Sequence, residues 1–449
     1  MLAIWPRRGA GTRRCADVGA LRVRVAAERS RVRRLARGYQ NLQILPRSWM
    51  VSAVPSDPSG SIDSLTVAAI LLRMRVISLF SGAGGLDLGF EKAGFKTVFA
   101  NEYDKTIWAT YRANFPKVHL DTRSIVDIPV TDVPEADGLI GGPPCQSWSE
   151  AGAHRGIEDQ RGQLFFEYER ILKHVKPKFF LAENVSGILS SRHSTAFAAI
   201  IERFRRLGYD VNYRMLRASD FGVPQDRDRV IIVGLRSDLG CEFAFPEPVG
   251  AAPTMRDVIY GMPKPRPNPS HSKRVDHRTV DNHEYLVSSF SSMYMSRNRV
   301  RAWDQQSFTI QAGARHAPIH PSAPKMEKMD DDKFRFALGH EEKYRRLSVR
   351  ECARIQTFPD THQFCYERIV DGYKMIGNAV PVEFGFHLAK AVKTALAGAR
   401  GRRGAARKSM KKTKMLSAVE VKAEVLPGKT RKGKDRRVVG QGEFSFAKE

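Results

Sequence analysis

The chain has 449 residues, enough for two or three domains, and its 42% hydrophobic content is ordinary for a globular protein. No apolar run approaches the roughly 18 residues needed to cross a bilayer, and the five scattered cysteines form no CxxC pair. We therefore expect no membrane partner, no disulfide framework and no metal site. The formal charge of +26 instead indicates a polyanionic partner, nucleic acid above all.

Much of this charge lies at the two ends of the chain. Residues 1–73 hold 13 Arg, no Lys and 4 acidic residues, while residues 400–449 hold 16 Lys plus Arg and 5 acidic residues. We interpret 1–73 as a basic extension, either disordered, transit-like or translated from a wrong start, with the working protein beginning near Met74. The composition of 400–449 is typical of a disordered basic tail, which could bind nucleic acid or simply aid solubility.

The globular part opens with a strand, a glycine turn and a helix. Val76–Phe80 is a short apolar run, "SGAGG" is a tight turn, and "LDLGFEKAG" has helical periodicity. This order is the first unit of a doubly wound α/β sheet, whose glycine turn lets a nucleotide-like ligand approach the backbone. A single glycine turn is weak evidence by itself.

Two acidic residues follow at the ends of the next predicted strands. The run 97–104 contains Glu102, about 20 residues after the glycines, where a carboxylate can accept hydrogen bonds from ribose hydroxyls. The third strand-like region contains Asp121, which could contact an adenine amine. Together they predict an adenosine cofactor without specifying which one.

Cys145 follows the fourth predicted strand, within "GGPPCQSWS". Ligands of open α/β sheets bind beyond the carboxyl ends of the strands, and the two prolines stiffen this loop. A thiolate there is suited to attack an electron-poor carbon. The next predicted strand, 177–189, carries Glu183 at its carboxyl end, placed to exchange a proton with a ring nitrogen of a substrate.

Arg227 and Arg229 lie in "QDRDR", just ahead of another predicted strand. Alternation places both side chains on one face, where they suit a ring oxygen or a phosphate.

These features, in this order, resemble the DNA (cytosine-5) methyltransferases over nearly all of residues 74–395. The matching motifs are "FSGAGGLDLGF", "GGPPCQSWS", "ENVSGIL", "QDRDR", "RECARIQTFP" and "GYKMIGNAVPV". Six ordered motifs are far more specific than one. Thr357, within "RIQTFP", stands where the family commonly has glycine.

The resemblance implies a mechanism. Cys145 would add to C6 of a cytosine flipped out of the duplex, and Glu183 would stabilise the adduct protonated at N3. C5 would then accept the methyl group of S-adenosylmethionine, the implied cofactor. Arg229 would lie near the base O2, with Arg227 orienting the site, and residues 146–162 would close over the base.

The resemblance also implies a set of binding residues. Phe80 would stack on the adenine, the loop 81–85 would pass under the methionine part, and Tyr103 would flank the adenine. The implied cofactor set is Phe80, Ser81, Gly82, Gly84, Gly85, Glu102, Tyr103, Asp121, Thr122, Leu164, Asn378 and Val380. For Phe80, Tyr103, Leu164 and Val380 a plain core role is an equal alternative.

Residues 246–345 correspond to the target-recognition domain of this family. Within them, the stretch beginning "NHEYLVSSF" is similar to the HaeIII-type methyltransferases, which act on GGCC. The resemblance assigns DNA contacts to Arg297, Arg299 and Arg315, and also to Gln146 and Ser147. Arginine can bond guanine O6 and N7 together, although each of these arginines could contact only phosphate.

The expected fold is therefore a doubly wound, Rossmann-like α/β methyltransferase domain with a smaller, mostly irregular and β recognition domain. Residues 74–245 and 346–399 would form the catalytic domain. We expect a monomer acting on double-stranded DNA in the bacterial cytoplasm, nucleoid-associated through DNA, with a possible cognate restriction endonuclease.

Three other interpretations account for part of the sequence. An RNA cytosine-5 methyltransferase shares these motifs, but about 100 residues of recognition region favour DNA. A non-enzymatic DNA-binding protein explains the charge but not Cys145, Glu183 and the glycine loop together. A dinucleotide oxidoreductase explains only the loop, and "SGAGGLDLG" does not fit the GxGxxG pattern.

Overall fold

The structure, a computed structural model, describes residues 73–144, 160–269 and 280–402. The predictions for the basic ends lie almost entirely outside these residues. A seven-stranded sheet forms the centre, in the order β3-β2-β1-β4-β5-β7-β6. Its strands are β1 (Arg75–Leu79), β2 (Lys96–Asn101), β3 (His119–Asp121), β4 (Gly138–Gly141), β5 (Phe179–Val185), β6 (Tyr209–Arg217) and β7 (Asp228–Arg236).

The first five strands are parallel, as expected for a doubly wound sheet, but β7 runs antiparallel to both β5 and β6. The sheet is therefore mixed, a feature that the sequence did not predict. Because β7 is reversed, its beginning lies at the edge where β5 ends. This reversal brings "QDRDR" to the carboxyl edge of the parallel strands. Arg229, expected just ahead of this strand, lies within it.

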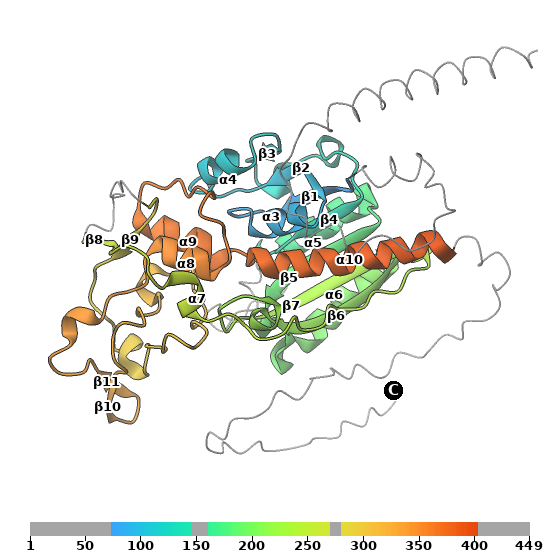
Figure 1. Cartoon of the computed structure of the whole chain (residues 1–449). Coiled ribbons are helices and arrows are strands. Elements are labelled where there is room, and N and C mark those ends of the chain that lie inside the picture. Colours follow the sequence, from blue (N-terminus) through green and yellow to red (C-terminus); the bar gives the residue numbers. More distant parts are fainter. Residues whose placement is uncertain (1–72, 145–159, 270–279, 403–449) are drawn as a thin grey trace, which may run out of the picture. The chain divides into compact units, whose positions relative to one another are not determined.

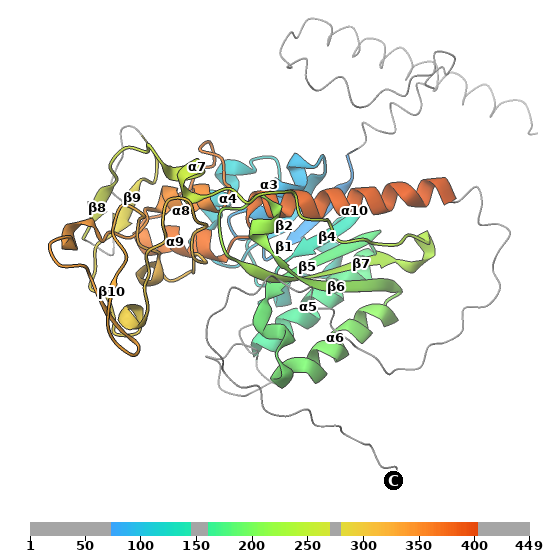
Figure 2. The same ribbon diagram turned by 60° about the horizontal axis from the view of Figure 1, so that its bottom comes forward.

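Helices cover both faces of the sheet (Figures 1 and 2). On one face, α3 (Gly85–Lys92) and α10 (Val382–Arg402) pack with Phe90, Phe179 and Ile231. On the other face, α5 (Gln160–Val175) and α6 (Ser194–Arg206) pack with Tyr168 and Phe204, over the strand neighbours Phe180 and Ile232. Consecutive apolar residues of β5 and β7 thus point to opposite layers, which is why these strands are continuously hydrophobic. The short helix α4 (Trp108–Asn114) lies between β2 and β3.

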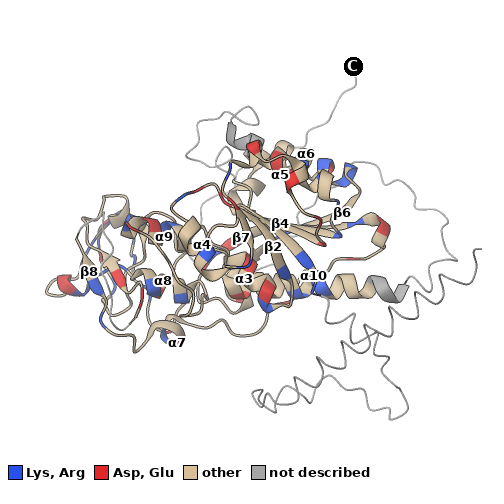
Figure 3. Cartoon of the chain, turned by 90° about the horizontal axis from the view of Figure 1, so that it is seen from above, with Lys and Arg blue, Asp and Glu red and all other residues tan. Residues whose placement is uncertain are grey.

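Between β7 and α8 the chain forms short, mostly irregular elements. These are α7 (Met255–Ile259), the parallel pair β8 (Arg266–Asn268) and β9 (Glu284–Leu286), and the antiparallel pair β10 (Glu327–Asp330) and β11 (Lys333–Arg335). A small core of its own includes Tyr294, Ile319 and Tyr344. This agrees with the expected irregular and β character of the smaller region. Lys and Arg recur around β8 and the neighbouring α8, interspersed with acidic residues (Figure 3).

The chain then returns to the layers around the central sheet through α8 (Val349–Ile355), α9 (Ile369–Asn378) and α10. A capping box at Ser348 and Glu351 starts α8. The helix α10 packs closely on α3, since a Cβ on Gly89 would lie 2.7 Å from the carbonyl oxygen of Val382. The last helix therefore completes the layer that α3 begins on this face of the sheet.

Candidate active site

Four parallel strands end in register at one edge of the sheet. Leu79 pairs with both Asn101 and Gly141, and Asn101 pairs with Asp121. The glycine loop, Glu102 and the Gly142–Pro144 segment follow these ends directly, and Asp121 is the last residue of β3. The sequence prediction that these residues gather at the carboxyl edge is consistent with this geometry.

Glu183 and Arg229 form an ion pair at this edge. Arg229 Nε lies 2.8 Å from Glu183 Oε1, and the two side chains are 13% and 11% exposed. The contact lacks hydrogen-bond geometry, so that Oε1 is buried without a hydrogen-bond partner among the described residues. A Cβ on Gly142 would lie 3.3 Å from Glu183 Oε2, so glycine leaves the carboxyl group room. The pair can therefore still bind a polar ligand.

The loop that leads to Cys145 is anchored beside Glu183. Asn184 Nδ2 donates to the carbonyl oxygen of Pro143 at 3.2 Å, which ties this loop to the end of β5. Cys145 itself lies outside the described residues, as do Gln146 and Ser147. Of the predicted closing loop 146–162, only 160–162 are described, and they already belong to α5.

Arg227 lies behind this pair and is 1% exposed. Its guanidinium donates to the carbonyl oxygens of Ile310 at 3.2 Å, Gly377 at 3.1 Å and Ala379 at 3.0 Å. Burial lowers its pKa well below the ordinary arginine value, and the nearby positive charge of Arg229 lowers it further. Arg227 thus joins the start of β7 to the smaller region and to the end of α9.

The glycine loop has the strained and open backbone expected of a ligand cradle. Phe80 has φ 54° and Gly82 has φ 56°, both in the left-handed region. A bulky residue adopts this conformation only when its surroundings enforce it. Among the residues that the structure describes, no atom lies within 4 Å of a Cβ built on Gly82, and the buried Ser81 Oγ has no hydrogen-bond partner. Both observations fit a polar ligand above the loop.

The other two loop glycines serve packing. A Cβ on Gly84 would lie 2.2 Å from the Phe115 ring, and one on Gly85 would lie 2.2 Å from the carbonyl oxygen of Val380. The Val380 end of the last motif therefore lies directly against the loop. Val380 is a buried core residue, whereas Asn378 is exposed.

Glu102 holds the loop from the end of β2. Its Oε2 accepts from Gly82 N at 2.9 Å and its Oε1 from Asp104 N at 2.8 Å. Burial raises the pKa of this carboxyl group despite these bonds. Each oxygen keeps acceptor capacity, so ribose hydroxyls fit here. Tyr103 is 71% exposed, which argues against its core alternative.

Asp121 is buried and already bound by Arg123. The Arg123 guanidinium contacts Asp121 Oδ2 at 2.6 Å and holds the pKa of this carboxyl group below its ordinary value. Thr122 is partly buried beside it. Leu164, on α5, is partly buried against the core that includes Phe165. These positions are compatible with the cofactor contacts and with the core alternative for Leu164.

The three arginines predicted to contact DNA differ in their surroundings. Arg297 and Arg315 are exposed, so their guanidinium groups are accessible. Arg299 instead donates to the carbonyl oxygens of Tyr294 at 2.8 Å and Met293 at 3.0 Å, and its guanidinium lies over the Tyr294 ring. Because these contacts use the Nε and Nη2 donors of its guanidinium group, Arg299 is held as part of the local structure. The sequence pattern did not distinguish Arg299 from Arg297 and Arg315 in this respect.

Sequence reasoning also missed two buried polar groups that support the glycine loop. Asp87 is fully buried in the first turn of α3, and His362 contacts the carbonyl oxygen of Ala83. The available signal was a carboxylate on the apolar face of "GGLDLGF" and a histidine between the aromatic residues of "FPDTHQF".

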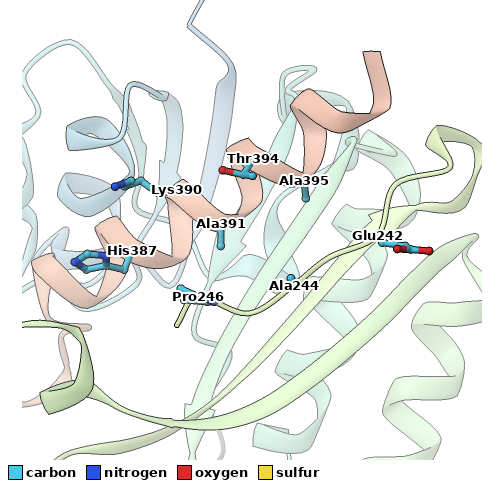
Figure 4. Close-up of a pocket in the computed structure, with 8 residues that line it drawn as sticks. All are labelled: Glu242, Ala244, Pro246, His387, Lys390, Ala391, Thr394 and Ala395. Atoms are coloured by element: carbon cyan, nitrogen blue, oxygen red, sulfur yellow. The ribbon is translucent and has the colours of Figure 1, made fainter. Parts of the chain in front are cut away.

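A surface pocket of about 320 Å³ lies away from these residues, between α10 and the segment 242–246 (Figure 4). Its lining includes Ala391, Ala395 and Lys390 but none of the predicted site residues. Within the described ranges, no helix is long and apolar enough to cross a membrane, and no three His, Cys, Asp or Glu side chains gather as a metal site.

Comparisons with known proteins agree with the geometry. A family model described as C-5 cytosine-specific DNA methylase matches residues 74–394. The chain is 54% identical to Type II methyltransferase M.NgoPII of Neisseria gonorrhoeae over 72% of this chain and 96% of that protein. It is 53% identical to Type II methyltransferase M.FnuDI of Fusobacterium nucleatum, over 72% of this chain and 95% of that protein.

Two solved structures share the fold. A putative DNA modification methyltransferase encoded within an Escherichia coli prophage has a TM-score of 0.56 and 25% identity, covering 72% of this chain and 99% of that one. A DNMT2 variant from Spodoptera frugiperda has a TM-score of 0.52 and 17% identity, again over 72% and 99%. At this identity the second likeness concerns the fold alone.

Proposed function

The chain belongs to the C-5 cytosine-specific DNA methylases, and on that premise we propose that it methylates the inner cytosine of GGCC in duplex DNA. It is a DNA cytosine-5 methyltransferase of the Type II restriction–modification kind, and its family implies dependence on S-adenosylmethionine. The Glu183–Arg229 pair carries the proposed chemistry, because a buried carboxyl oxygen there keeps its acceptor capacity beside the loop leading to Cys145.

The reaction begins with the target base outside the stack, since a duplex hides C6 of cytosine. The Cys145 thiolate adds to C6 while the Glu183 carboxyl group holds a proton at N3, and Arg229 donates to O2. The addition makes C5 an enamine-like carbon. After methyl transfer, C5 loses its proton to a base, the bond between Cys145 Sγ and C6 breaks, and the aromatic ring is restored.

When bound, S-adenosylmethionine supplies the electrophilic methyl group. The Ser81 hydroxyl and the open backbone at Gly82 would hold its methionine part, and Glu102 would accept hydrogen bonds from the ribose. Tyr103, with its exposed ring, would flank the adenine, and Asp121 would accept from its amine. These assignments are supported by the orphaned serine oxygen and the remaining acceptor sites of the carboxylates.

For the target sequence, we assign guanine contacts to Arg297 and Arg315 because both are exposed. Arg299 would instead fix the backbone that presents Arg297, since it is bonded to the carbonyl oxygens of Tyr294 and Met293. We further propose that the enzyme acts as a monomer on nucleoid DNA, protecting sites that a cognate endonuclease cuts.

The test is to incubate the full chain with S-adenosylmethionine and unmethylated plasmid, and to map 5-methylcytosine by bisulfite sequencing. We expect methylation confined to the inner cytosine of GGCC. Cys145→Ser should abolish it while DNA binding persists, and the matched control Cys365→Ser should remain active. Methylation at another short site would refute the target assignment, and an active Cys145→Ser variant would refute the mechanism.

A further inference from the structure

Asp87 links three elements directly behind the glycine loop. Its side chain is fully buried, with Oδ2 at 2.9 Å from Ser78 Oγ and Oδ1 at 2.8 Å from the Tyr111 hydroxyl oxygen. Ser78 belongs to β1, Asp87 to the first turn of α3, and Tyr111 to α4. The loop connects the first two of these elements, so their spacing at Asp87 limits the conformations that the loop can adopt.

A second contact fixes the middle of the loop. His362 Nε2 lies 3.1 Å from the carbonyl oxygen of Ala83, so the imidazole donates from Nε2–H. Phe115 fills the space beside Gly84 and stacks on Tyr111, with ring centroids 4.7 Å apart. We call Asp87, Tyr111, Phe115 and His362 the loop brace. It joins the loop from α3, α4 and the segment after α8.

The loop brace contains one group whose charge changes near neutral pH. Burial raises the pKa of Asp87 to about 7, while its contacts with Tyr111 and Ser78 oppose this rise. Glu91, one turn further along α3, adds to the rise through its own negative charge. Burial lowers the pKa of His362 to about 4, so the imidazole stays neutral at neutral pH.

We propose that Asp87 is a positioning residue of the cofactor loop, and that its charge state sets the affinity for S-adenosylmethionine; this rests on the cofactor assignment proposed above. The ionised carboxylate accepts hydrogen bonds from both hydroxyls at once and so holds β1 and α4 against α3. Once protonated, it must donate through one oxygen, and one hydroxyl has to reorient.

Electrostatics act in the same direction. S-adenosylmethionine carries a sulfonium and an ammonium group against one carboxylate, which makes it a net cation. A buried negative charge under its loop favours a cationic ligand, because the interior screens charges poorly. Affinity therefore rises as pH rises through the titration of Asp87.

The experiment measures the dissociation constant of S-adenosylmethionine for the full chain by calorimetry at about pH 6 and about pH 8. We expect wild-type binding to be about three- to ten-fold tighter at the higher pH. The affinity of Asp87→Asn should change with pH only through the titration of the ligand's own ammonium group. That contribution is common to all variants. The matched control Glu91→Gln removes a carboxyl group from the same helix but leaves Asp87 in place. It should keep the dependence, with the midpoint moved to lower pH, because the negative charge of Glu91 raises the pKa of Asp87.

Tyr111→Phe provides a second variant that leaves Asp87 in place. Loss of the hydroxyl donor removes an interaction that lowers the pKa of Asp87, so the midpoint of the affinity curve should move to higher pH. A purely structural role for Tyr111 would weaken binding without moving this midpoint. Equal wild-type affinity at both pH values, or a full dependence in Asp87→Asn, would refute the Asp87 proposal alone. Absence of wild-type binding at both pH values would overturn the cofactor assignment together with it.

Discussion

Glu183→Gln is the substitution that separates the proposed chemistry from the architecture around it. Glutamine keeps the size of the side chain and one acceptor oxygen, but it lacks the carboxyl group that holds a proton at N3 of the base in the proposed mechanism. Positioned acid–base groups typically contribute about 10²- to 10⁴-fold to a rate, or about 3–5 kcal/mol of barrier. We expect the rate of methyl transfer in a single turnover to fall within that range.

The structure also gives the expected change in stability. Arg229 is 13% exposed and loses its 2.8 Å counterion in this variant. Breaking a fully buried pair costs about 3–5 kcal/mol, and the retained amide oxygen with some remaining solvent access reduces this to about 1–3 kcal/mol. The free energy of unfolding, measured in urea, should fall by this amount, while the affinity for S-adenosylmethionine changes by less than about two-fold.

The matched control is Glu202→Gln, which removes a carboxylate from an exposed ion pair with Arg206 on α6. Its activity and stability should equal those of the wild type within about 0.5 kcal/mol. If Glu183→Gln transferred methyl groups at the wild-type rate while folded, the role assigned to Glu183 would be wrong. If both variants lost activity equally, the loss would reflect charge in general rather than the site.

Three further predictions concern stability and recognition. Thr357→Val should lower the free energy of unfolding, measured in urea, by about 1–2 kcal/mol. The Thr357 hydroxyl accepts a hydrogen bond from Glu383 N at the start of α10, and valine loses this bond while the backbone strain at φ 61° remains. An unchanged free energy of unfolding would show that this hydrogen bond contributes nothing to stability. His362, with its pKa lowered from 6.5 to about 4, resists protonation only in the folded state, so its contribution to stability is present above pH 6.5 and is lost as pH falls through about 4. In His362→Phe the free energy of unfolding should therefore fall less steeply as pH is lowered from 6.5 to about 4. A fall as steep as that of the wild type would refute this prediction. Arg297→Ala should reduce the discrimination between bases at its position by about 1–3 kcal/mol. Arg315→Lys keeps the positive charge but removes the paired N–H donors of the guanidinium group, and should likewise reduce discrimination at the second position. Unaltered bisulfite maps for both variants would exclude direct base contacts.

Much of this fold could be predicted from periodicity. The strand, glycine turn and helix at 75–92 are local, because the apolar run, the turn residues and the helical spacing all lie within about 20 residues. Glu183 could be placed at a carboxyl edge because β5 is a continuous apolar run that stops there. Such features depend on neighbours in the sequence.

The remaining features depend on contacts between distant segments. The antiparallel direction of β7 is set by pairing with β5, and no pattern inside Asp228–Arg236 states it. Arg227 and Arg299 resemble their neighbours in sequence, and only the carbonyl groups around them show that they are occupied. Thr357 stands where the resemblance leads one to expect glycine, but its left-handed φ depends on the surrounding structure and cannot be predicted from the residue itself.

The packing of α10 against α3 has a consequence for synthesis of the protein on the ribosome. The glycine-lined face of α3 meets its partner only after roughly 290 further residues, the distance from Lys92 to Val382, have been made, which takes on the order of 15–60 s at typical elongation rates. Until then the glycine loop lacks the Val380 carbonyl group that lies against Gly85. A nascent chain stalled inside residues 246–345 would thus present Arg297 and Arg315 while the layer of α3 and α10 is still incomplete, and methylation can begin only once nearly all of residues 74–394 have left the exit tunnel.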